Sequence, residues 1–587
     1  MITSDAPSMV EEATDEPTAA TRHLCAGVYV DERFRDLVID EVCTAPHRRV
    51  APSYGFDIVP VMHHAWMAAA LSASLRAAVI GAAMFPVFVG AVPATILVTC
   101  GLALLWLLHA AALLRDIETE PRYKRNSKRR GLGTARRQLR LLTMIFTWRY
   151  SGRIKYSEKI RAFKQIGVVA LNLVLVGLFV AVAFPVHVTS ALYSAGTIAV
   201  SCLLVGAARQ VLLNRILRAS DLRPKQLSRR QRVADVQQQH VCAVYRRPRH
   251  NEDDDDLTVF TLFGEESPFI GAGELVYQWN PPICIQLLRP SDDNEAPLHE
   301  REHPVPPFQA HELVEYLRGA VQQLDTDDGE VRLPVQVRDR VYVAETDVAT
   351  DHALLPDRID KNDMRAIINT PGSKSHHFLE ITMPLEGGEF VATVMLNVSL
   401  QGRTLSISTA ACVLAHSPRS FQHAEEFGQS GAIAVVWAAL RQLSTLPREI
   451  SRCWRIIRYF YALSKAALLP RDLTSTPIRN VLVGTRISAR EKAAQAWSKI
   501  QLEKSGILGR MKTIEQRLLH AAGDFLHAND VDISEFNDRA MKIINSGIFN
   551  FGDNNTFSNN AVGDGSQASS TVNQPANPGN QGNGGSK

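Results

Sequence analysis

Two glycine-containing segments have residue types that could bind phosphate. Gly271-Ala272-Gly273 is part of the pattern of a dinucleotide-binding loop, and Gly372-Ser373-Lys374-Ser375 is similar to the end of a phosphate-binding loop. Both patterns are incomplete, because Val276 replaces the third glycine of GxGxxG and the phosphate-loop pattern lacks its first glycine. We therefore expect neither segment to bind a nucleotide.

Other residues could in principle ligate a metal or act as acid and base. Hard cations prefer several carboxylate oxygens, but the consecutive acids Glu252 to Asp256 cannot all face one ion, which favours a solvated loop. His376 and His377 have no evident nucleophile as a partner, so they predict no triad. The eight cysteines contain no CxxC pair, which argues against a disulfide framework and a zinc site. The sequence predicts no catalytic residue, metal or cofactor and favours a protein that is not an enzyme.

Two long stretches without Asp, Glu, Lys or Arg indicate a membrane protein. Ala77 to Leu114 has 38 residues and Ile166 to Ala208 has 43, whereas one helix needs about 20 residues to cross the hydrocarbon core. Each stretch therefore predicts a hairpin of two spans, with turns near Gly90 and Pro185. Buried helices of a soluble protein are the alternative, but such helices seldom stay uncharged over this length.

Arg76 is the one charged residue at the edge of the first hairpin, if the first span starts near Met67. An arginine at that depth is costly unless it extends to the interface or faces protein. Otherwise the first span starts nearer Ala77 and is short.

The basic residues predict how the hairpins are oriented. Residues 115–164 contain sixteen Lys or Arg and four acids, and another basic segment follows the second hairpin. By the positive-inside rule we expect both termini in the cytoplasm and the protein in the plasma membrane, as a multi-pass protein facing anionic lipid headgroups. We expect no nucleic-acid partner, because a loop between spans is a poor platform for one. The basic residues expected at the membrane interface are Arg129, Arg130, Arg136, Arg137, Arg140, Arg452, Arg455 and Arg458.

After the membrane region, short β-branched runs predict a β-rich domain over 233–417, with one clear helix at Ala310 to Leu324. The best hairpin joins Phe390 to Leu400 and Leu405 to Ala415 through a turn of about four residues. Helical periodicity then returns, and the predicted helices are Gly431 to Leu443, Glu449 to Leu469, Ser488 to Leu502, Thr513 to Asn529 and a last helix from Asp532 to Gly547. The fold class is α+β: a four-helix transmembrane region of two hairpins, a β-rich cytoplasmic domain, C-terminal helices and a disordered tail.

The C-terminal tail has the composition of an assembly motif. Phe549-Asn550-Phe551-Gly552 places apolar, amide and glycine residues in order, and Val562-Gly563 follows in a weaker second copy. Such segments can stack in register between identical chains. This segment resembles the amyloid signalling motifs of bacterial and fungal immune-type proteins, which are related to the RIP homotypic interaction motif. That resemblance implies a homo-oligomer or a partner protein with the same motif. A flexible tail continuous with 570–587 is the alternative.

The chain as a whole resembles uncharacterised multispan membrane proteins of actinobacteria. The resemblance is carried by His23-Leu24-Cys25, Pro46-His47-Arg48, Ala51-Pro52-Ser53-Tyr54-Gly55 and Pro268-Phe269-Ile270-Gly271. It implies a bacterial inner membrane location and no particular activity.

We thus predict a non-enzymatic membrane protein with a cytoplasmic domain that senses or binds a partner and with a tail that mediates assembly. A pore or channel effector assembled through the tail, and a membrane-tethered enzyme of unrecognised fold, are the alternatives. The predicted segments are a disordered tail (1–22), a juxtamembrane segment (23–66), transmembrane hairpin 1 (67–114), a basic loop (115–165), transmembrane hairpin 2 (166–208), a basic linker (209–232), the β-rich domain (233–417), a helical region (418–547), the assembly motif (548–569) and a disordered tail (570–587).

Overall fold

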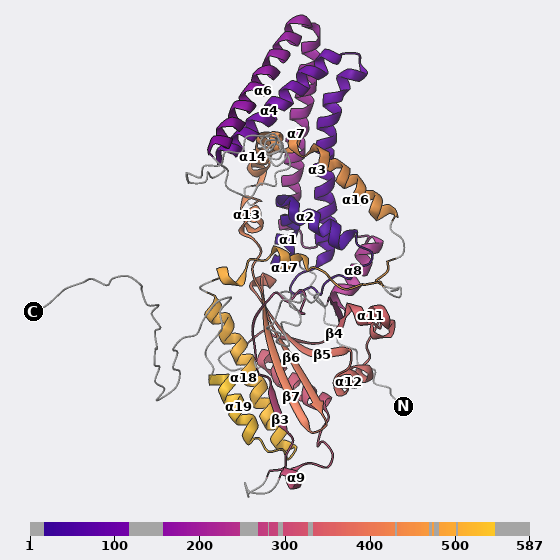
Figure 1. Ribbon diagram of the computed structural model, residues 1–587, viewed down its shortest axis with the longest axis vertical. Helices are drawn as coiled ribbons and strands as arrows, with labels where there is room; N and C mark the ends of the chain where they lie inside the picture. The colour runs from indigo at the N-terminus through magenta and orange to yellow at the C-terminus, as the bar shows by residue number, and fades with distance from the viewer. Residues whose placement is uncertain are drawn as a thin grey trace, which may run out of the picture.

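The protein is elongated, with apolar helical hairpins at one end and a β-sheet at the other (Figure 1). This computed structural model describes residues 17–116, 156–246, 268–279, 281–290, 298–326, 333–428, 431–468, 472–474, 481–500 and 503–545. The α+β class predicted from the sequence is confirmed.

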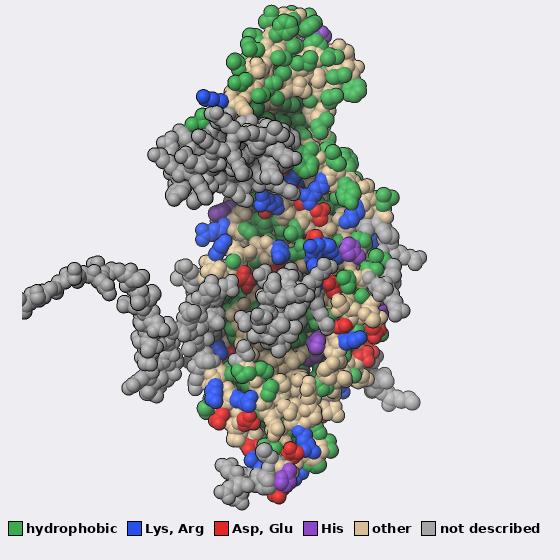
Figure 2. Space-filling model, in the orientation of Figure 1, with side chains coloured by type: hydrophobic (Ala, Val, Ile, Leu, Met, Phe, Trp, Pro, Cys, Tyr) green, Lys and Arg blue, Asp and Glu red, His purple; other side chains and the backbone are tan. Residues whose placement is uncertain are grey.

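Four long helices at one end are apolar enough to cross a membrane. They form two hairpins: α3 (Ile58–Phe88) with α4 (Val92–Asp116), and α6 (Tyr156–Ala183) with α7 (Val186–Arg218). Gly90 has the left-handed φ of +77° in the first turn, as its position in the sequence predicts. Figure 2 shows this end covered by hydrophobic side chains, whereas the visible charged side chains lie below it. The four predicted spans are confirmed as apolar helices.

Helices α3 and α7 extend beyond the hairpins and form a stalk with shorter helices. Leu24, Met62 and Ile216 belong to one buried apolar cluster there. The other stalk elements are α1 (Ala19–Val30), α2 (Glu32–Leu37), the π-helix η1 (Val38–Cys43) and α8 (Arg229–Gln239). Helix α1 begins at Ala19, within the segment predicted to be a disordered tail up to residue 22. Thr18 caps it by accepting a hydrogen bond from the Thr21 backbone NH.

Within the described residues, the other end contains a seven-stranded sheet in the order β1-β4-β5-β6-β7-β2, with β3 also paired to β7. Strand β1 is parallel to β4, and the other pairs are antiparallel. The predicted hairpin of β6 and β7 is confirmed, but its turn is tighter than expected because Gln401 pairs with Thr404. The strands are β1 (Cys242–Tyr245), β2 (Glu274–Gln278), β3 (Ile283–Gln286), β4 (Gln336–Ala344), β5 (Ser375–Leu385), β6 (Phe390–Gln401) and β7 (Thr404–Leu414).

Helices cover the sheet and bury its apolar residues. Leu313 and Leu317 of α10 join Met511 and Leu518 of α18 in one large core with the strands. The predicted helix at Ala310 to Leu324 is therefore confirmed. The helices of this end are α9 (Leu298–Arg301), α10 (Ala310–Thr326), α11 (Glu345–Thr350), α12 (Lys361–Asn369), α18 (Lys504–Ala528) and α19 (Ser534–Asn545).

Between β7 and α18 the chain returns to the membrane helices. Helix α14 packs along α7, and α16 packs against α3 (Figure 1). The helix predicted over Glu449 to Leu469 is broken in two near Arg452, and most of Ser488 to Leu502 is not helical, which corrects both predictions. The returning elements are α13 (Arg419–Gly428), α14 (Gly431–Ser444), α15 (Leu446–Ser451), the 3-10 turn η5 (Cys453–Arg455), α16 (Ile456–Leu468) and α17 (Ala489–Ala493).

Very close helix contacts hold this returning segment in place. A Cβ on Gly206 of α7 would lie 2.7 Å from Gln442 Cβ and 2.9 Å from Ala439 Cα of α14. A Cβ on Gly27 of α1 would lie 2.4 Å from the Phe421 ring of α13. Both glycines are needed because no larger side chain fits the space between the helices.

Candidate functional site

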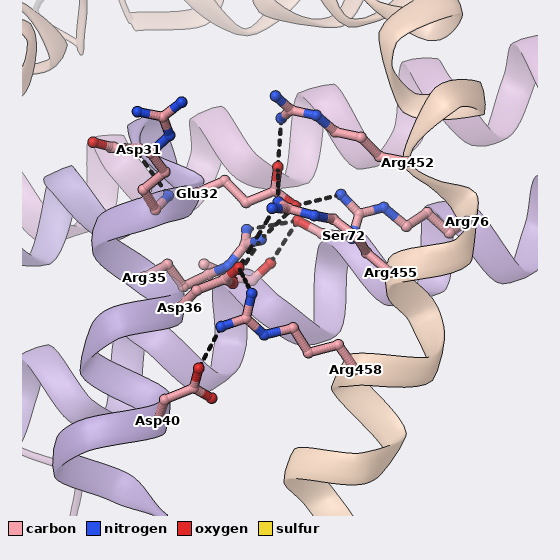
Figure 3. A network of polar contacts seen from close by, with 12 residues as sticks. Asp31, Glu32, Arg35, Asp36, Asp40, Ser72, Arg76, Arg452, Arg455 and Arg458 are labelled. Atoms are coloured by element: carbon pink, nitrogen blue, oxygen red, sulfur yellow. Dashed lines mark hydrogen bonds and ion pairs between the residues drawn. The ribbon is translucent and has the colours of Figure 1, made fainter. Parts of the chain in front are cut away.

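Arg76 joins three segments that are far apart in the sequence. It lies in α3 and is only 4% exposed. Its Nη2 donates to Glu32 Oε1 at 2.6 Å (Figure 3). The same nitrogen donates to Glu449 Oε2 at 3.2 Å. Glu32 comes from α2 and Glu449 from α15. Of the possibilities that the sequence left open for Arg76, the structure therefore selects a side chain that faces protein.

Glu32 is the carboxylate shared by most arginines of this network. Arg35 Nη2 lies 3.1 Å from its Oε1, and Arg455 Nη1 lies 2.9 Å from its Oε2. Arg452 also donates to Oε2. Because the Glu32 side chain is 12% exposed, its charge is stabilised mainly by these arginines rather than by water.

A second row of ion pairs continues the network along α2 and η1. Arg458 lies 3.1 Å from Asp36 and also pairs with Asp40 (Figure 3). The acids are spaced by four residues along α2 and η1. The arginines are spaced by three, from the end of α15 through η5 into α16. The ion pairs show that the two rows face each other and are complementary.

The arginines move the pKa of Glu32 away from its usual value. Burial alone would raise this pKa, but the charges of Arg76, Arg35 and Arg452 outweigh burial and lower it to about 2. Asp36 differs, because burial raises its pKa despite the nearby arginines.

These shifts predict how stability depends on pH. The pKa of Glu32 is lower in the folded state than in the unfolded state. The ionised Glu32 side chain therefore stabilises the folded protein above pH 4.5, and this stabilisation is lost as the pH falls towards 2. Its size is about 3 kcal/mol by linkage. We expect the free energy of unfolding of the protein in detergent to fall over this range, and Glu32→Gln to flatten the fall. The Asp36→Asn variant should not flatten it, because a raised carboxyl pKa has the opposite sign. An equally steep fall in Glu32→Gln would refute the assignment.

The predicted site residues are only partly within the described chain. Arg452, Arg455 and Arg458 lie together, but their side chains face acids of α2 and η1. The basic loop residues Arg129, Arg130, Arg136, Arg137 and Arg140 lie outside the described residues, as does the acidic run Glu252 to Asp256. The tail residues Phe549, Asn550, Phe551, Gly552, Val562 and Gly563 also lie outside them. Glu32, Asp36 and Asp40 were not among the predicted site residues, although their four-residue spacing is visible in the sequence.

The two glycine segments do not form phosphate loops. Gly273 has a φ of +98°, and a Cβ there would lie 2.1 Å from the Val413 oxygen of β7. Strand β2 follows Gly273, and strand β5 follows Lys374, whereas a phosphate loop leads into a helix. Gly271 and Gly273 therefore allow close packing of the backbone, whereas Gly372, with a φ of +75° and open space around it, allows a turn before β5.

A second buried polar network connects the stalk to the sheet. Arg340 Nε lies 2.8 Å from Glu380 Oε2, and the Tyr54 hydroxyl donates to the same oxygen at 2.9 Å. Glu380 is 2% exposed. Arg490 is also buried and donates to the backbone oxygens of Tyr54 and Gly388. The segment before α3 is thereby fixed to the sheet.

Two histidine groups could offer metal or proton chemistry. Glu386, His416 and Glu503 have ligand atoms within 4.8 Å of one another, but both acids are exposed. His377 Nε2 lies 2.8 Å from Asp339, which Arg318 also contacts. Neither group brings a nucleophile beside the histidine in the described part of the chain, so the ion-pair network around Arg76 is the more developed site.

The four apolar helices and the sheet domain fit a membrane-spanning protein with a soluble α+β domain. Residues 278–558 match the family model of the AbeC-like domain, which agrees with the expected likeness to an uncharacterised family. None of the curated proteins or solved structures that were compared matches the chain. The AbeC-like domain starts at the end of β2 and includes α13 to α16. The domain thus contains both most of the sheet and the helices that pack on the membrane hairpins.

Proposed function

We propose that this chain is a multi-pass plasma-membrane protein whose cytoplasmic AbeC-like domain binds a partner and exchanges a signal with the membrane helices by direct contact. The observation that carries this proposal is the sharing of Arg76 of α3 between Glu32 and Glu449. A domain that only needed an anchor would require a linker and no buried charge network. Movement of α3 within the bilayer would change the distances to both carboxylates.

The basic residues support the orientation. The loop between the two hairpins, residues 115–164, holds sixteen Lys or Arg and four acids. The positive-inside rule places this loop, both termini and the sheet in the cytoplasm. The turns near Gly90 and Pro185 then face the opposite side.

Thiol labelling tests this orientation. Val89 lies 66% exposed in the first turn, and Gln401 is exposed at the end of the β6–β7 hairpin. With a membrane-impermeant maleimide, Val89→Cys should react in intact cells, and Gln401→Cys only after permeabilisation. The unsubstituted protein controls for its eight native cysteines. Labelling of Gln401→Cys in intact cells would overturn the cytoplasmic assignment.

In this proposal, the C-terminal tail mediates assembly between copies of the protein. The low charge and the apolar-amide-glycine order of Phe549 to Gly552 support stacking between chains. A peptide of residues 547–570 should form fibrils that bind thioflavin, and the same peptide with Phe551→Asp and Val562→Asp should remain soluble. A soluble native peptide would remove assembly from the proposal and leave the docked domain unaffected.

A further inference from the structure

A cavity of about 580 Å³ opens beside the Arg76 network, between α3, α7, α14 and α15. Two glutamates, Glu32 and Glu449, and six arginines line it. The arginines are Arg35, Arg76, Arg209, Arg441, Arg448 and Arg452. The cavity therefore carries a clear excess of positive charge.

Both glutamates are already engaged by part of this set. Glu32 pairs with Arg35, Arg76 and Arg452, and Glu449 pairs with Arg76. Within the described chain, the guanidinium groups of Arg209, Arg441 and Arg448 have no hydrogen bond or ion pair. Holding like charges together in a partly enclosed space is costly without an anion.

These three arginines come from three different elements and converge on the same space. Arg209 is in α7, Arg441 in α14 and Arg448 in α15. The like charges of Arg35, Arg448 and Arg441 act on Arg209 and are opposed by the single carboxylate Glu449. The close packing of α14 on Gly206, one turn before Arg209, fixes their relative positions. Planar guanidinium groups arranged around one space are suited to the oxygens of a phosphate.

The cavity lies at the level expected for lipid headgroups. Gly206 is 20 residues beyond Val186, the first residue of α7, which is about 30 Å along a helix and equals the thickness of the hydrocarbon core. The outer face of α14 is apolar, with Ile433, Val436, Trp437 and Leu440 between 50% and 67% exposed. Such a helix lies in the membrane interface with its apolar face towards the acyl chains.

We propose that the cavity lined by Arg209, Arg441 and Arg448 binds a phosphate-bearing anion. A phospholipid headgroup and a free phosphate compound share this chemistry. Binding would compensate the excess positive charge in the cavity. It would also link α7, which belongs to the second membrane hairpin, to α14 and α15, which belong to the AbeC-like domain. The bound anion would thus stabilise the contact on which the proposed signalling depends.

The test uses the full-length protein purified in detergent. Binding of dioctanoyl-phosphatidylglycerol, dioctanoyl-phosphatidylcholine and inorganic phosphate is measured by calorimetry for the native protein and for the variant Arg209→Gln, Arg441→Gln, Arg448→Gln. A control variant, Arg229→Gln, Arg232→Gln, Arg358→Gln, removes the same charge from exposed arginines outside the cavity. Thermal unfolding of each variant shows that it is folded.

We expect the native protein and the control to bind phosphatidylglycerol, and the cavity variant to bind at least about tenfold more weakly, because each charged hydrogen bond lost costs about a factor of ten. If inorganic phosphate competes with phosphatidylglycerol and binds equally strongly, the phosphate site is supported and its ligand is a free phosphate compound rather than a lipid headgroup. Equal binding by the cavity variant and the control would overturn the proposal. The thiol-labelling result does not depend on this outcome, so the two proposals fail separately.

Discussion

Replacing Arg76 by Gln should lower the free energy of unfolding by about 3 to 5 kcal/mol, the cost of removing one partner from a buried ion pair. The change leaves Glu32 and Glu449 without the cation that they share. Arg35 and Arg452 still contact Glu32, which limits the loss at that carboxylate. Urea unfolding in detergent, followed by circular dichroism, measures the effect.

Arg33→Gln is the matched control for Arg76→Gln. Arg33 lies on α2 beside Glu32 but is exposed, so its loss should change stability by no more than about 0.5 kcal/mol. Arg76→Gln combined with Glu449→Gln should recover part of the loss, because the second change neutralises the unpaired carboxylate. Equal stability of the Arg76 and Arg33 variants would show that the network does not hold the stalk together.

Arg340→Met should destabilise the sheet domain to a similar degree, about 3 to 5 kcal/mol. Glu380 is almost fully buried, and in this variant the Tyr54 and Thr382 hydroxyls would be its remaining donors. Arg340 and Glu380 lie on the adjacent strands β4 and β5. Chemical unfolding is again the measurement.

Two further variants serve as the control and the rescue for Arg340→Met. Arg358→Met removes an exposed arginine and should have little effect. Arg340→Met with Glu380→Met replaces the pair by two apolar side chains and should regain most of the lost stability. Arg340 also donates to the His240 backbone oxygen at 2.7 Å, and the Tyr54 hydroxyl donates to Glu380. Failure of the double variant to improve on Arg340→Met would mean that these two hydrogen bonds, rather than the ion pair, supply the stability.

The membrane helices were predictable from the sequence because their signal is local. Soluble proteins seldom contain helices that stay uncharged over stretches of 38 and 43 residues, so membrane spans are the favoured structure. The turn at Gly90 follows from the backbone freedom of glycine. The β6–β7 hairpin was predictable for the same reason, since both strands and the glycine between them are contiguous.

The position of the returning helices was not predictable in this way. Trp454, Phe460 and Tyr461 are more than half exposed, in agreement with the aromatic surface expected for this segment. The partners of Arg452 and Arg458 are more than 400 residues away, however, and a basic-aromatic pattern does not distinguish a lipid phosphate from a carboxylate. The spacing of Glu32, Asp36 and Asp40 against the arginines is the only local trace of the contact.

The helix predicted over Ser488 to Leu502 was wrong for a physical reason. Arg490 of α17 is fully buried because it donates to two backbone oxygens on different segments, and Trp497 packs into the core of the sheet. These tertiary contacts outweigh the helix propensity of the alanines and lysines in this segment.

The most direct test is whether the AbeC-like domain is held in a fixed position on the membrane helices. Spin labels on Val186→Cys, at the first residue of α7, and Gln401→Cys, at the end of the β6–β7 hairpin, report the distance between the membrane helices and the sheet by pulsed electron resonance in nanodiscs. Both positions are exposed. The docked arrangement predicts one narrow distance distribution, and adding Gly206→Leu, which separates α14 from α7, should broaden it. A broad distribution in the labelled protein without Gly206→Leu would contradict direct contact and show that the domain is only tethered to the membrane.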